Sequence, residues 1–458
     1  MKNILYILLL FCLTIVGCSK DYDGEFELDE DKLFVRDYGE SGQITFTSQD
    51  LSEYEVSSAP DGWEVVVSAS DKTITVTAPN EDDEEIEVAG TVYIYGYTPD
   101  DDSVYVYFSV GIADKIALDD PSNDQQANCM IVTQPNTVYT FNPNRRGEST
   151  TEVSEKAVDC EVVWRTSGSP ISFVEMTDDG DITFYTKPSW DDDVMELTEG
   201  NVVIAALSDS EEVLWSWHIW VTETPVEDVE VAGMTFLDRN LGAFMNDNSD
   251  DDNILDSYGL YYQWGRKDPF IYANTYNASG STDAYLYDDD GYYFTMSQQE
   301  SNAVYGQWIF SRLSPATFVT GDPELDGDWL YGSDKNDYLW GTNGEKSIYD
   351  PSPKGYRVPT SAEYAQLTLN EEEELTLESY GRTLDGELFM AYGVRTYLDY
   401  TIQNYKADGS YARWAGYYWS CDANEAESDA LYFDSDGNIG VTTSKRATGM
   451  QIRSIKME

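Results

Sequence analysis

Short runs of β-branched and aromatic residues, separated by turn signals, dominate the N-terminal part of this chain. Thr73–Thr77 alternates between polar and apolar side chains, and Val92–Tyr95 and Val104–Phe108 are rich in valine and tyrosine. Such runs are typical of strands, because successive side chains of a strand point to opposite faces of the sheet. Turn-forming residues at Thr98–Asp102 separate two of them. Strands at this spacing predict an Ig-like β-sandwich over residues 26–113.

A second set of predicted strands follows this sandwich. Its members are Cys129–Val132, Glu161–Trp164, Asn201–Ala206 and Val213–Val221. Each is a short, mostly apolar run bounded by polar residues, which favours a covered strand, and each is too short to cross a membrane. We therefore predict a second β-sandwich over residues 114–223.

The last of these strands is the most hydrophobic segment downstream of the N-terminal apolar run. Alternation puts one set of large apolar side chains on one face and a mixed set on the other, namely Trp215, Trp217 and Ile219 opposite Leu214, Ser216, His218 and Trp220. We expect both faces to be covered. No nucleophile motif accompanies His218, the single histidine. This favours a hydrogen-bonded structural role for His218 over that of a catalytic base.

From residue 230 onward the composition shifts to glycine, aspartate, asparagine and aromatic residues. One helix is predicted near Ser361–Leu367, with Thr360 or Ser361 as its N-cap. A hairpin is predicted where Leu431–Phe433 and Ile439–Val441 flank a turn-forming segment. The expected fold class is mostly β and multidomain, with two Ig-like β-sandwiches followed by an α+β domain over residues 230–458.

The charge balance excludes several functions. The chain of 458 residues carries 27 basic and 86 acidic side chains, a formal net charge of −59. Nucleic acid and anionic lipid are poor partners for it, because phosphate binding requires clustered lysine and arginine. One histidine cannot build a zinc site, and there is no G-x-S-x-G elbow. We predict no catalytic residues, and with so many carboxylates any chosen glycosidase-type pair is uninformative.

The N-terminus has the pattern of an export signal. A basic start, Met1–Asn3, precedes an apolar run, Ile4–Val16, that is too short to span a bilayer, and Gly17-Cys18 follows. This junction resembles the lipobox of bacterial lipoproteins. The resemblance implies a signal peptide over residues 1–17, lipid attachment at Cys18 and an acidic tether over residues 18–25, similar to that of Bacteroides-type surface lipoproteins. It also implies an outer-membrane location, lipid-anchored and facing outward.

Four ordered motifs lie in the C-terminal region: Leu237–Ala243, Tyr258–Pro269, Asp350–Thr360 and Tyr418–Ser420. Their order and spacing resemble the FISUMP family, the Fibrobacter major paralogous domain. This resemblance implies a C-type-lectin-like domain over residues 230–458, related to the formylglycine-generating-enzyme fold. Those enzymes use paired cysteines, and Cys421 is the only cysteine after residue 230. The resemblance therefore implies a binding domain and not formylglycine-generating activity.

Within these motifs, several residues stand out as candidates for a structural role: Trp264, Arg266, Tyr356, Arg357, Pro359, Trp419 and Arg453. Large aromatic rings supply apolar area to a loop-rich core. Buried guanidinium groups, including Arg239 and Arg446, would hold loops by pairing with aspartate or with backbone carbonyls. We favour such clamps over a ligand-facing arginine cluster, and no ligand-binding residue can be assigned from the sequence.

Cysteine usage leaves one alternative open and suggests one contact. Cys129 and Cys160 are the only pair within one predicted domain, and they are either bridged or free, with free thiols favoured. FISUMP members often carry cysteine where this chain has Ser352 and Ser454. The resemblance thus implies that these two serines lie side by side, as if a disulfide had been lost as a unit.

Two acidic clusters raise the question of calcium. Asp322, Asp326 and Asp328 form one, and the run from Asp434 to Asn438 forms the other. The second lacks the distal glutamate of an EF-hand and is more simply a hairpin turn. We assign no metal ligands and no cofactor, leaving a structural Ca²⁺ as an open alternative.

These observations together predict a non-catalytic cell-surface lipoprotein that serves in adhesion or binds a ligand, a glycan among the candidates, through its C-terminal domain. The expected partners are the outer membrane, through the lipid, and an unidentified extracellular ligand or protein. The alternative is an accessory or tip subunit of a fimbrial or glycan-uptake assembly.

Overall fold

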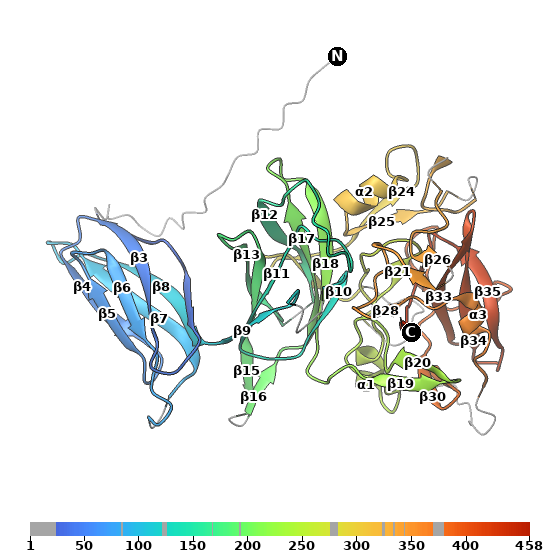
Figure 1. Ribbon diagram of the computed structural model, residues 1–458, viewed down its shortest axis with the longest axis horizontal. Helices are drawn as coiled ribbons and strands as arrows, with labels where there is room; N and C mark the ends of the chain where they lie inside the picture. The colour runs from blue at the N-terminus through green and yellow to red at the C-terminus, as the bar shows by residue number, and fades with distance from the viewer. Residues whose placement is uncertain are drawn as a thin grey trace, which may run out of the picture. The chain divides into compact units, whose positions relative to one another are not determined.

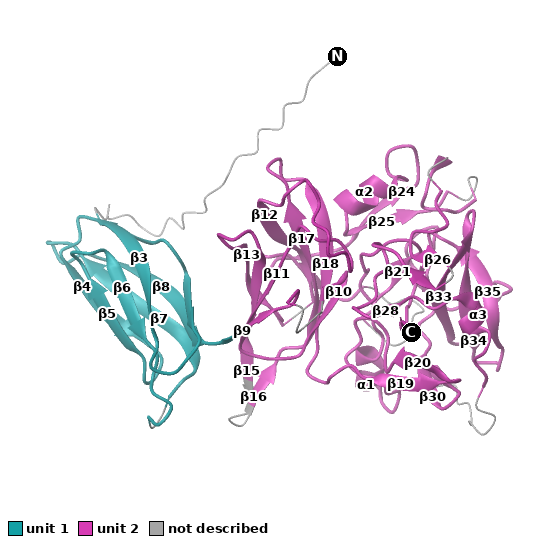
Figure 2. Ribbon diagram, viewed as in Figure 1, with its two compact units in different colours: residues 1–114 teal, residues 115–458 magenta. Residues whose placement is uncertain are grey.

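The computed structural model describes residues 24–83, 86–120, 126–166, 168–191, 194–274, 283–322, 326–332, 335–342, 344–369 and 380–458. The predicted signal peptide, Cys18 and most of the predicted tether lie outside these residues. The chain divides into two compact units, residues 1–114 and 115–458 (Figure 2). Nearly all regular structure is β-strand, so the prediction of a mostly β, multidomain protein is confirmed.

The first unit is a sandwich of two four-stranded sheets (Figure 1). One sheet has the order β1 (Glu25–Leu28), β3 (Ser41–Gln49), β6 (Thr73–Thr77), β5 (Glu64–Ser68). The other has the order β2 (Lys32–Val35), β8 (Ser103–Ile112), β7 (Ala89–Tyr97), β4 (Glu53–Ser58). Alternate side chains such as Ile74, Ile94 and Phe108 fill the space between the sheets. The three strands predicted from alternation are confirmed.

The second unit begins with another pair of facing sheets. The larger has the order β10 (Cys129–Val132), β18 (Val213–Val221), β17 (Gly200–Leu207), β12 (Asp159–Arg165), β22 (Leu286–Tyr287), β23 (Tyr293–Phe294). The smaller has the order β13 (Ser172–Met176), β14 (Ile182–Thr186), β11 (Thr137–Phe141), β9 (Asp114–Ala117), and β15 (Pro188–Asp191) with β16 (Val194–Leu197) forms a separate hairpin. The four strands predicted here are confirmed. β22 and β23, from beyond residue 230, extend this sheet, which no sequence pattern indicated.

Strand β18 is buried along its whole length and separates two cores. Trp215, Trp217 and Ile219 belong to the core between the facing sheets. On the opposite face, Trp220 belongs to the large core formed mainly by residues after 230. The prediction that both faces of this strand are covered is therefore confirmed. Since the two cores share this strand, residues 115–458 form one compact unit.

The region after residue 227 is built from short strands and long loops. One sheet has the order β19 (Asp228–Val231), β20 (Met234–Leu237), β37 (Ile455–Lys456), β28 (Tyr356–Arg357), so the end of the chain pairs with the start of this region. A second has the order β21 (Tyr262–Gln263), β36 (Gly449–Met450), β31 (Val394–Arg395), β32 (Ile402–Gln403). The third contains the predicted hairpin, now confirmed, as β33 (Ala415–Asn424), β34 (Glu427–Asp434) and β35 (Ile439–Lys445).

Three two-stranded sheets complete this region. They are β24 (Ser297–Glu300) with β25 (Thr317–Thr320), β26 (Gly341–Thr342) with β27 (Glu345–Lys346), and β29 (Gly381–Leu384) with β30 (Glu387–Met390).

Three short helices occur among the described residues: α1 (Asp251–Asp256), α2 (Trp308–Leu313) and α3 (Ser361–Tyr364). The predicted helix is confirmed as α3, although it ends three residues earlier than expected. Thr360 is its N-cap and forms a capping box with Glu363. The sequence predicted one or two helices in this region and did not locate α1 and α2, because both are too short to show a helical period.

Candidate functional site

Buried cations hold the loops of the second unit together. Arg453 is fully buried, and its guanidinium donates to the carbonyls of Leu237 (2.8 Å), Asp238 (2.7 Å) and Leu388. Its nearest carboxylate oxygen, on Glu387, is 3.9 Å away. Carbonyl dipoles rather than a close counter-ion therefore satisfy this charge. The arrangement joins the start of the region, the β29–β30 hairpin and the end of the chain.

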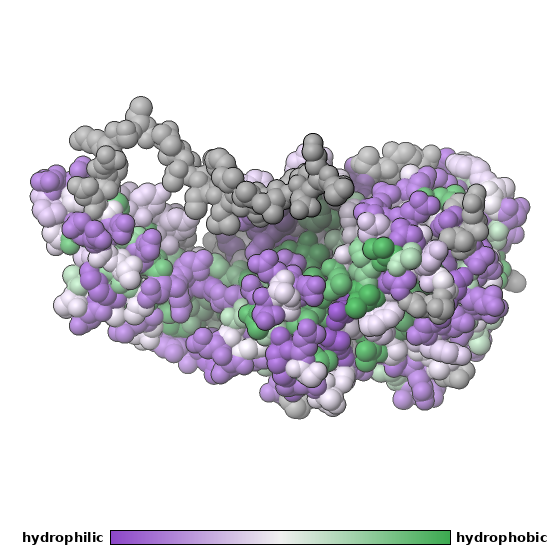
Figure 3. Space-filling model, turned by 90° about the horizontal axis from the view of Figure 1, so that it is seen from above, coloured by the Kyte–Doolittle hydropathy of each residue, from purple (hydrophilic) through white to green (hydrophobic). Residues whose placement is uncertain are grey.

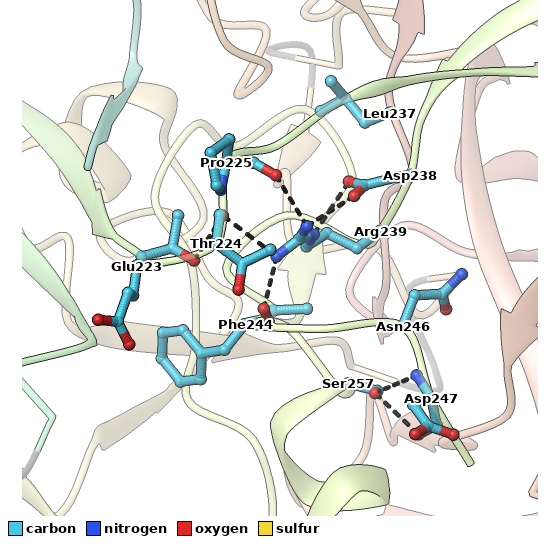
Figure 4. A network of polar contacts seen from close by, with 12 residues as sticks. Glu223, Thr224, Pro225, Leu237, Asp238, Arg239, Phe244, Asn246, Asp247 and Ser257 are labelled. Carbon is cyan, nitrogen blue, oxygen red and sulfur yellow. Dashed lines mark hydrogen bonds and ion pairs between the residues drawn. The ribbon is translucent and has the colours of Figure 1, made fainter. Parts of the chain in front are cut away.

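Arg239 holds the segment between β18 and β19 in place (Figure 4). Its guanidinium contacts the Asp238 carboxylate through two nitrogens, at 2.9 and 2.6 Å. It also donates to the carbonyls of Thr224 and Pro225, at 3.5 and 3.0 Å, and to that of Phe244. One side chain thus binds the segment between β18 and β19 to the residues that follow it.

A group of tryptophans surrounds the Tyr258–Pro269 motif. Trp264 is fully buried and donates its indole N–H to the carbonyl of Ser420 at 3.0 Å, while Trp419 donates to that of Tyr262 at 2.8 Å. Arg266, also buried, donates to the carbonyl of Thr317 at 2.6 Å. These residues point into the core and are not available to a ligand.

Near α3, the motif residues Tyr356 and Arg357 are half-buried. Arg357 contacts both carboxylate oxygens of Glu363, at 2.9 and 2.6 Å. Burial disfavours ionised Glu363, but the hydrogen bonds from Arg357 and Thr360 outweigh it and lower the pKa of Glu363. Pro359 is buried, and its carbonyl accepts from the amide of Cys421 at 2.8 Å. Tyr356 donates its hydroxyl to Asp228.

Arg357 and Glu363 form part of the wall of a cleft with a volume of about 1020 Å³. Its other walls come from the β19–β20 turn, the β26–β27 hairpin, the loop at Glu148 and the end of the chain. The lining residues are Glu148, Ser149, Gly233, Met234, Thr235, Gly344, Glu345, Lys346, Ser347, Ile348, Arg357, Glu363, Ile455, Lys456, Met457 and Glu458. Sequence reasoning missed this cleft, because its segments lie far apart in the chain. Only Arg357 had been singled out.

The three cationic side chains of the cleft, Lys346, Arg357 and Lys456, are held by ion pairs. Lys346 is almost buried and forms an ion pair with Glu148. It also donates to the carbonyls of Ser352 and Pro353, at 2.9 Å in both cases. Lys456 pairs with Asp228. No histidine or cysteine lines the cleft among the described residues. The arrangement offers paired charges, hydroxyls and backbone groups at fixed positions, which suits hydrogen bonding to a polar ligand.

Ser352 and Ser454 lie in contact beside this cleft. Both are fully buried, and the Ser454 hydroxyl donates to that of Ser352 at 2.8 Å. The predicted side-by-side placement of the two serines is confirmed. Ser352 is held further by its amide, which donates to the buried carboxylate of Asp350 at 2.8 Å.

The three cysteines of the described residues are free thiols. Cys129 on β10 and Cys160 on β12 are separated by β18 and β17 in their sheet. Three strand spacings amount to about 14 Å, beyond the reach of a disulfide. Burial raises the pKa of Cys160 and of Cys421 to about 12, so both thiols stay protonated at neutral pH.

His218 is buried on β18 and shares a hydrogen bond of 2.8 Å, through Nε2, with the Asn201 side chain. Its ring stacks on that of Trp220 at 6.5 Å between centroids. Burial lowers the pKa of His218 to about 3. No base of this kind faces the cleft, and the placement fits the structural role expected of His218.

His218 should make stability depend on pH. Its folded pKa, about 3, lies below the unfolded value of about 6.5, so between them the unfolded state binds more protons. The stability that neutral His218 contributes is present above pH ~6.5 and is lost as the pH falls toward 3. We expect wild type to lose about 2 kcal/mol more than His218→Gln between pH 7 and 5 in denaturant titrations. Identical losses in both proteins would contradict this placement.

The two acidic clusters have other partners. Asp434 accepts from the amides of Asp436 (2.9 Å) and Asn438 (3.1 Å), so this run closes the β34–β35 turn. Asp328 is buried against Arg446, whose Nε lies 3.2 Å from its carboxylate. Among the described residues, no group of three or more His, Cys, Asp or Glu side chains is arranged to hold a metal ion.

Comparisons with known proteins give no family. No family model and no curated protein matches this chain. Among solved structures, the D00-D0 domain of intimin is 11% identical, covering 43% of this chain and 96% of its own, with a TM-score of 0.17. An endo-fucoidan hydrolase of glycoside hydrolase family 107 is 11% identical, covering 44% and 34%, with a TM-score of 0.18.

A third match is the SGBP-B protein of the Bacteroides ovatus mixed-linkage glucan utilization locus, solved with a mixed-linkage heptasaccharide. It is 12% identical, covers 44% of this chain and 45% of its own, and has a TM-score of 0.12. Likenesses this weak carry no argument about this chain, and the resemblance to FISUMP stays a prediction. In the described part of the chain, no helix has the length and apolar character that crossing a membrane requires.

Proposed function

We propose that this chain is a non-catalytic, lipid-anchored protein of the outer membrane that faces outward and binds an extracellular ligand through the polar cleft of its second unit. The observation that carries this proposal is the cleft itself, about 1020 Å³ in volume and walled by segments from six parts of the chain. Ligand sites are typically concave and of about 300–1,000 Å³.

The cleft is organised for binding before any ligand arrives. Lys346 and Arg357 are already held by Glu148 and Glu363, and Arg453 fixes the loops behind them. A ligand therefore does not pay the entropy of ordering these walls. The charged lining favours a polar ligand with several hydrogen-bonding groups, as a glycan has. No nucleophile paired with a base is needed for this role.

A bulky side chain placed in the cleft should weaken ligand binding. Thr235 lines the cleft from β20, and tryptophan there retains a good strand former while occupying the space. We expect Thr235→Trp to weaken binding of the cleft's ligand, sought by glycan-array and protein-array screening, by about tenfold or more. Val441→Trp, on an exposed position of β35 outside the cleft, is the matched control and should bind normally. Normal binding by Thr235→Trp would refute the cleft as the site.

The anchor rests on the Gly17-Cys18 junction after a short apolar run. We expect mass spectrometry of the membrane fraction to find a mature, acylated N-terminus at Cys18. Replacing Cys18 by alanine should release the protein from the membrane. A mature N-terminus elsewhere would refute lipid attachment at this residue.

A second candidate role, as an accessory or tip subunit of a larger assembly, draws on the apolar surface at α2. Val304, Trp308 and Ile309 are exposed there, with 65%, 42% and 45% of their surfaces accessible. Exposed apolar groups of this size often mark protein contacts. Trp308→Ser with Ile309→Ser should abolish capture of a partner protein if this role holds, and leave glycan binding intact.

A further inference from the structure

The outer face of one sheet in the first unit carries five tyrosines. Tyr93, Tyr95 and Tyr97 alternate along β7, and Tyr105 and Tyr107 alternate along its neighbour β8. Tyr93 lies opposite Tyr107 and Tyr95 opposite Tyr105, with ring centroids 5.7 Å apart in both pairs. The centroids of Tyr95 and Tyr97 are 6.3 Å apart. These five tyrosines, called the tyrosine stripe below, lie on one face of the sheet in two groups of contacting rings.

The tyrosine stripe is not required by the core. The residues between the tyrosines, among them Ile94 and Val106, point inward and fill the sandwich. Tyr93, Tyr105 and Tyr107 are 40%, 57% and 60% exposed. Strand propensity explains a tyrosine at any one position, but three successive outward positions of β7 and two of β8 carry one. A cluster of exposed aromatic side chains of this kind favours an interaction site.

The surroundings of the stripe are polar and acidic. Glu53 and Glu55 lie on β4 opposite Tyr97 and Tyr95, and Tyr97 donates its hydroxyl to Glu55 at 2.9 Å. Serine and threonine continue the two strands at Thr91 and Ser109. The aliphatic side chains of these strands face the core, so the stripe presents rings and hydroxyl groups to the solvent.

The negative charge of the chain limits which polymers can bind to the tyrosine stripe. The chain has a formal net charge of −59, and two carboxylates border the stripe. An anionic polymer would be repelled, whereas a neutral, hydroxyl-rich chain would find acceptors in these carboxylates. Sugar rings are amphipathic, with apolar C–H faces and hydroxyl edges. Tyrosine offers the matching pair of an apolar ring face and a polar tip.

We propose that the tyrosine stripe binds a neutral polysaccharide chain, whose sugar rings stack on the tyrosine rings while its hydroxyl groups bond to Glu53 and Glu55. This site lies in the first unit and goes beyond the proposed function of the cleft, on which it does not depend. A surface with several rings binds a polysaccharide more tightly than a single sugar. The polysaccharide loses its translational entropy once, whereas each further sugar–ring contact adds binding energy.

The test uses the purified full chain and a panel of neutral polysaccharides, namely mixed-linkage β-glucan, xylan, galactomannan and starch, with polygalacturonate as the anionic comparison. We expect affinity electrophoresis to show binding of at least one neutral polymer and none of polygalacturonate. Tyr105→Thr with Tyr107→Thr, which retains β-propensity, should weaken this binding by about tenfold or more. Tyr105→Phe with Tyr107→Phe retains the rings and should bind within about threefold of wild type.

Two controls make the result specific. Tyr338→Ala with Tyr411→Ala removes equally exposed tyrosines of the second unit and should leave polysaccharide binding unchanged. Thr235→Trp changes only the cleft, whereas the threonine variant changes only the stripe. A polymer that the threonine variant still binds and Thr235→Trp does not is a ligand of the cleft and overturns this proposal, so failure of the two proposals is distinguishable. Unaltered binding by the threonine variant, binding of polygalacturonate only, or no binding of any neutral polymer by wild type would overturn the proposal.

Discussion

Replacing Arg453 by methionine should destabilise the second unit by about 3–5 kcal/mol. Methionine has a similar length but donates nothing, so the carbonyls of Leu237, Asp238 and Leu388 would be left without this donor inside the core. The stacking of the guanidinium over Phe389, 4.4 Å from the ring centroid, would also be lost. All tryptophans except Trp63 lie after residue 114, so tryptophan fluorescence during denaturant unfolding reports mainly on this unit.

Lys156→Met is the matched control, because it removes an equally charged side chain from an exposed pair with Glu152. Exposed pairs of this kind contribute little to stability, so the unfolding midpoint of Lys156→Met should stay close to that of wild type. If Arg453→Met unfolded within about 1 kcal/mol of wild type, the clamp account would be wrong.

The double change Ser352→Cys with Ser454→Cys should form a disulfide in air and stabilise the second unit by about 3–5 kcal/mol. The two hydroxyl oxygens are 2.8 Å apart, and the residues are 102 positions apart in the chain. A bridge that closes so long a loop restricts the unfolded chain strongly. Thiol titration and unfolding with and without reductant measure both effects.

Each single cysteine variant serves as the control and should change stability by less than about 1 kcal/mol, since cysteine is close to serine in size and tolerates burial. The stabilisation of the double variant should vanish when reductant is added. Two thiols that remain free after oxidation would show that the contact between the serines does not bring the backbones close enough for a bridge.

Elements with an uninterrupted local pattern could be predicted with their bounds. β6, β10 and β18 coincide with the segments read from the sequence, because each is a clear alternating or apolar run ended by polar residues. The contact between Ser352 and Ser454 was also predicted, but from the family resemblance and not from any local pattern. Hydrogen bonding in α3 was predictable from Thr360 and Glu363, three residues apart.

What escaped prediction depends on contacts between distant parts of the chain. β22 joins the sheet of the second sandwich through a single pairing of Tyr287 with Arg165, which no run of residues announces. Buried Arg395 and Lys267 were missed as clamps, since a basic residue carries no sign of its burial in the sequence. The cleft combines Glu148, which pairs with Lys346, with the last residues of the chain, which pair with β20 and β28. These contacts join segments that lie far apart in the sequence.

The central claim is that the cleft of the second unit binds the extracellular ligand. Hydrogen exchange, measured with and without the ligand that array screening identifies, tests it most directly. Binding should slow amide exchange in residues 233–235, 344–348 and 455–458, the segments that line the cleft, and leave β34 and β35 unchanged. Protection confined to other parts of the chain, with these three segments unaffected, would contradict the claim.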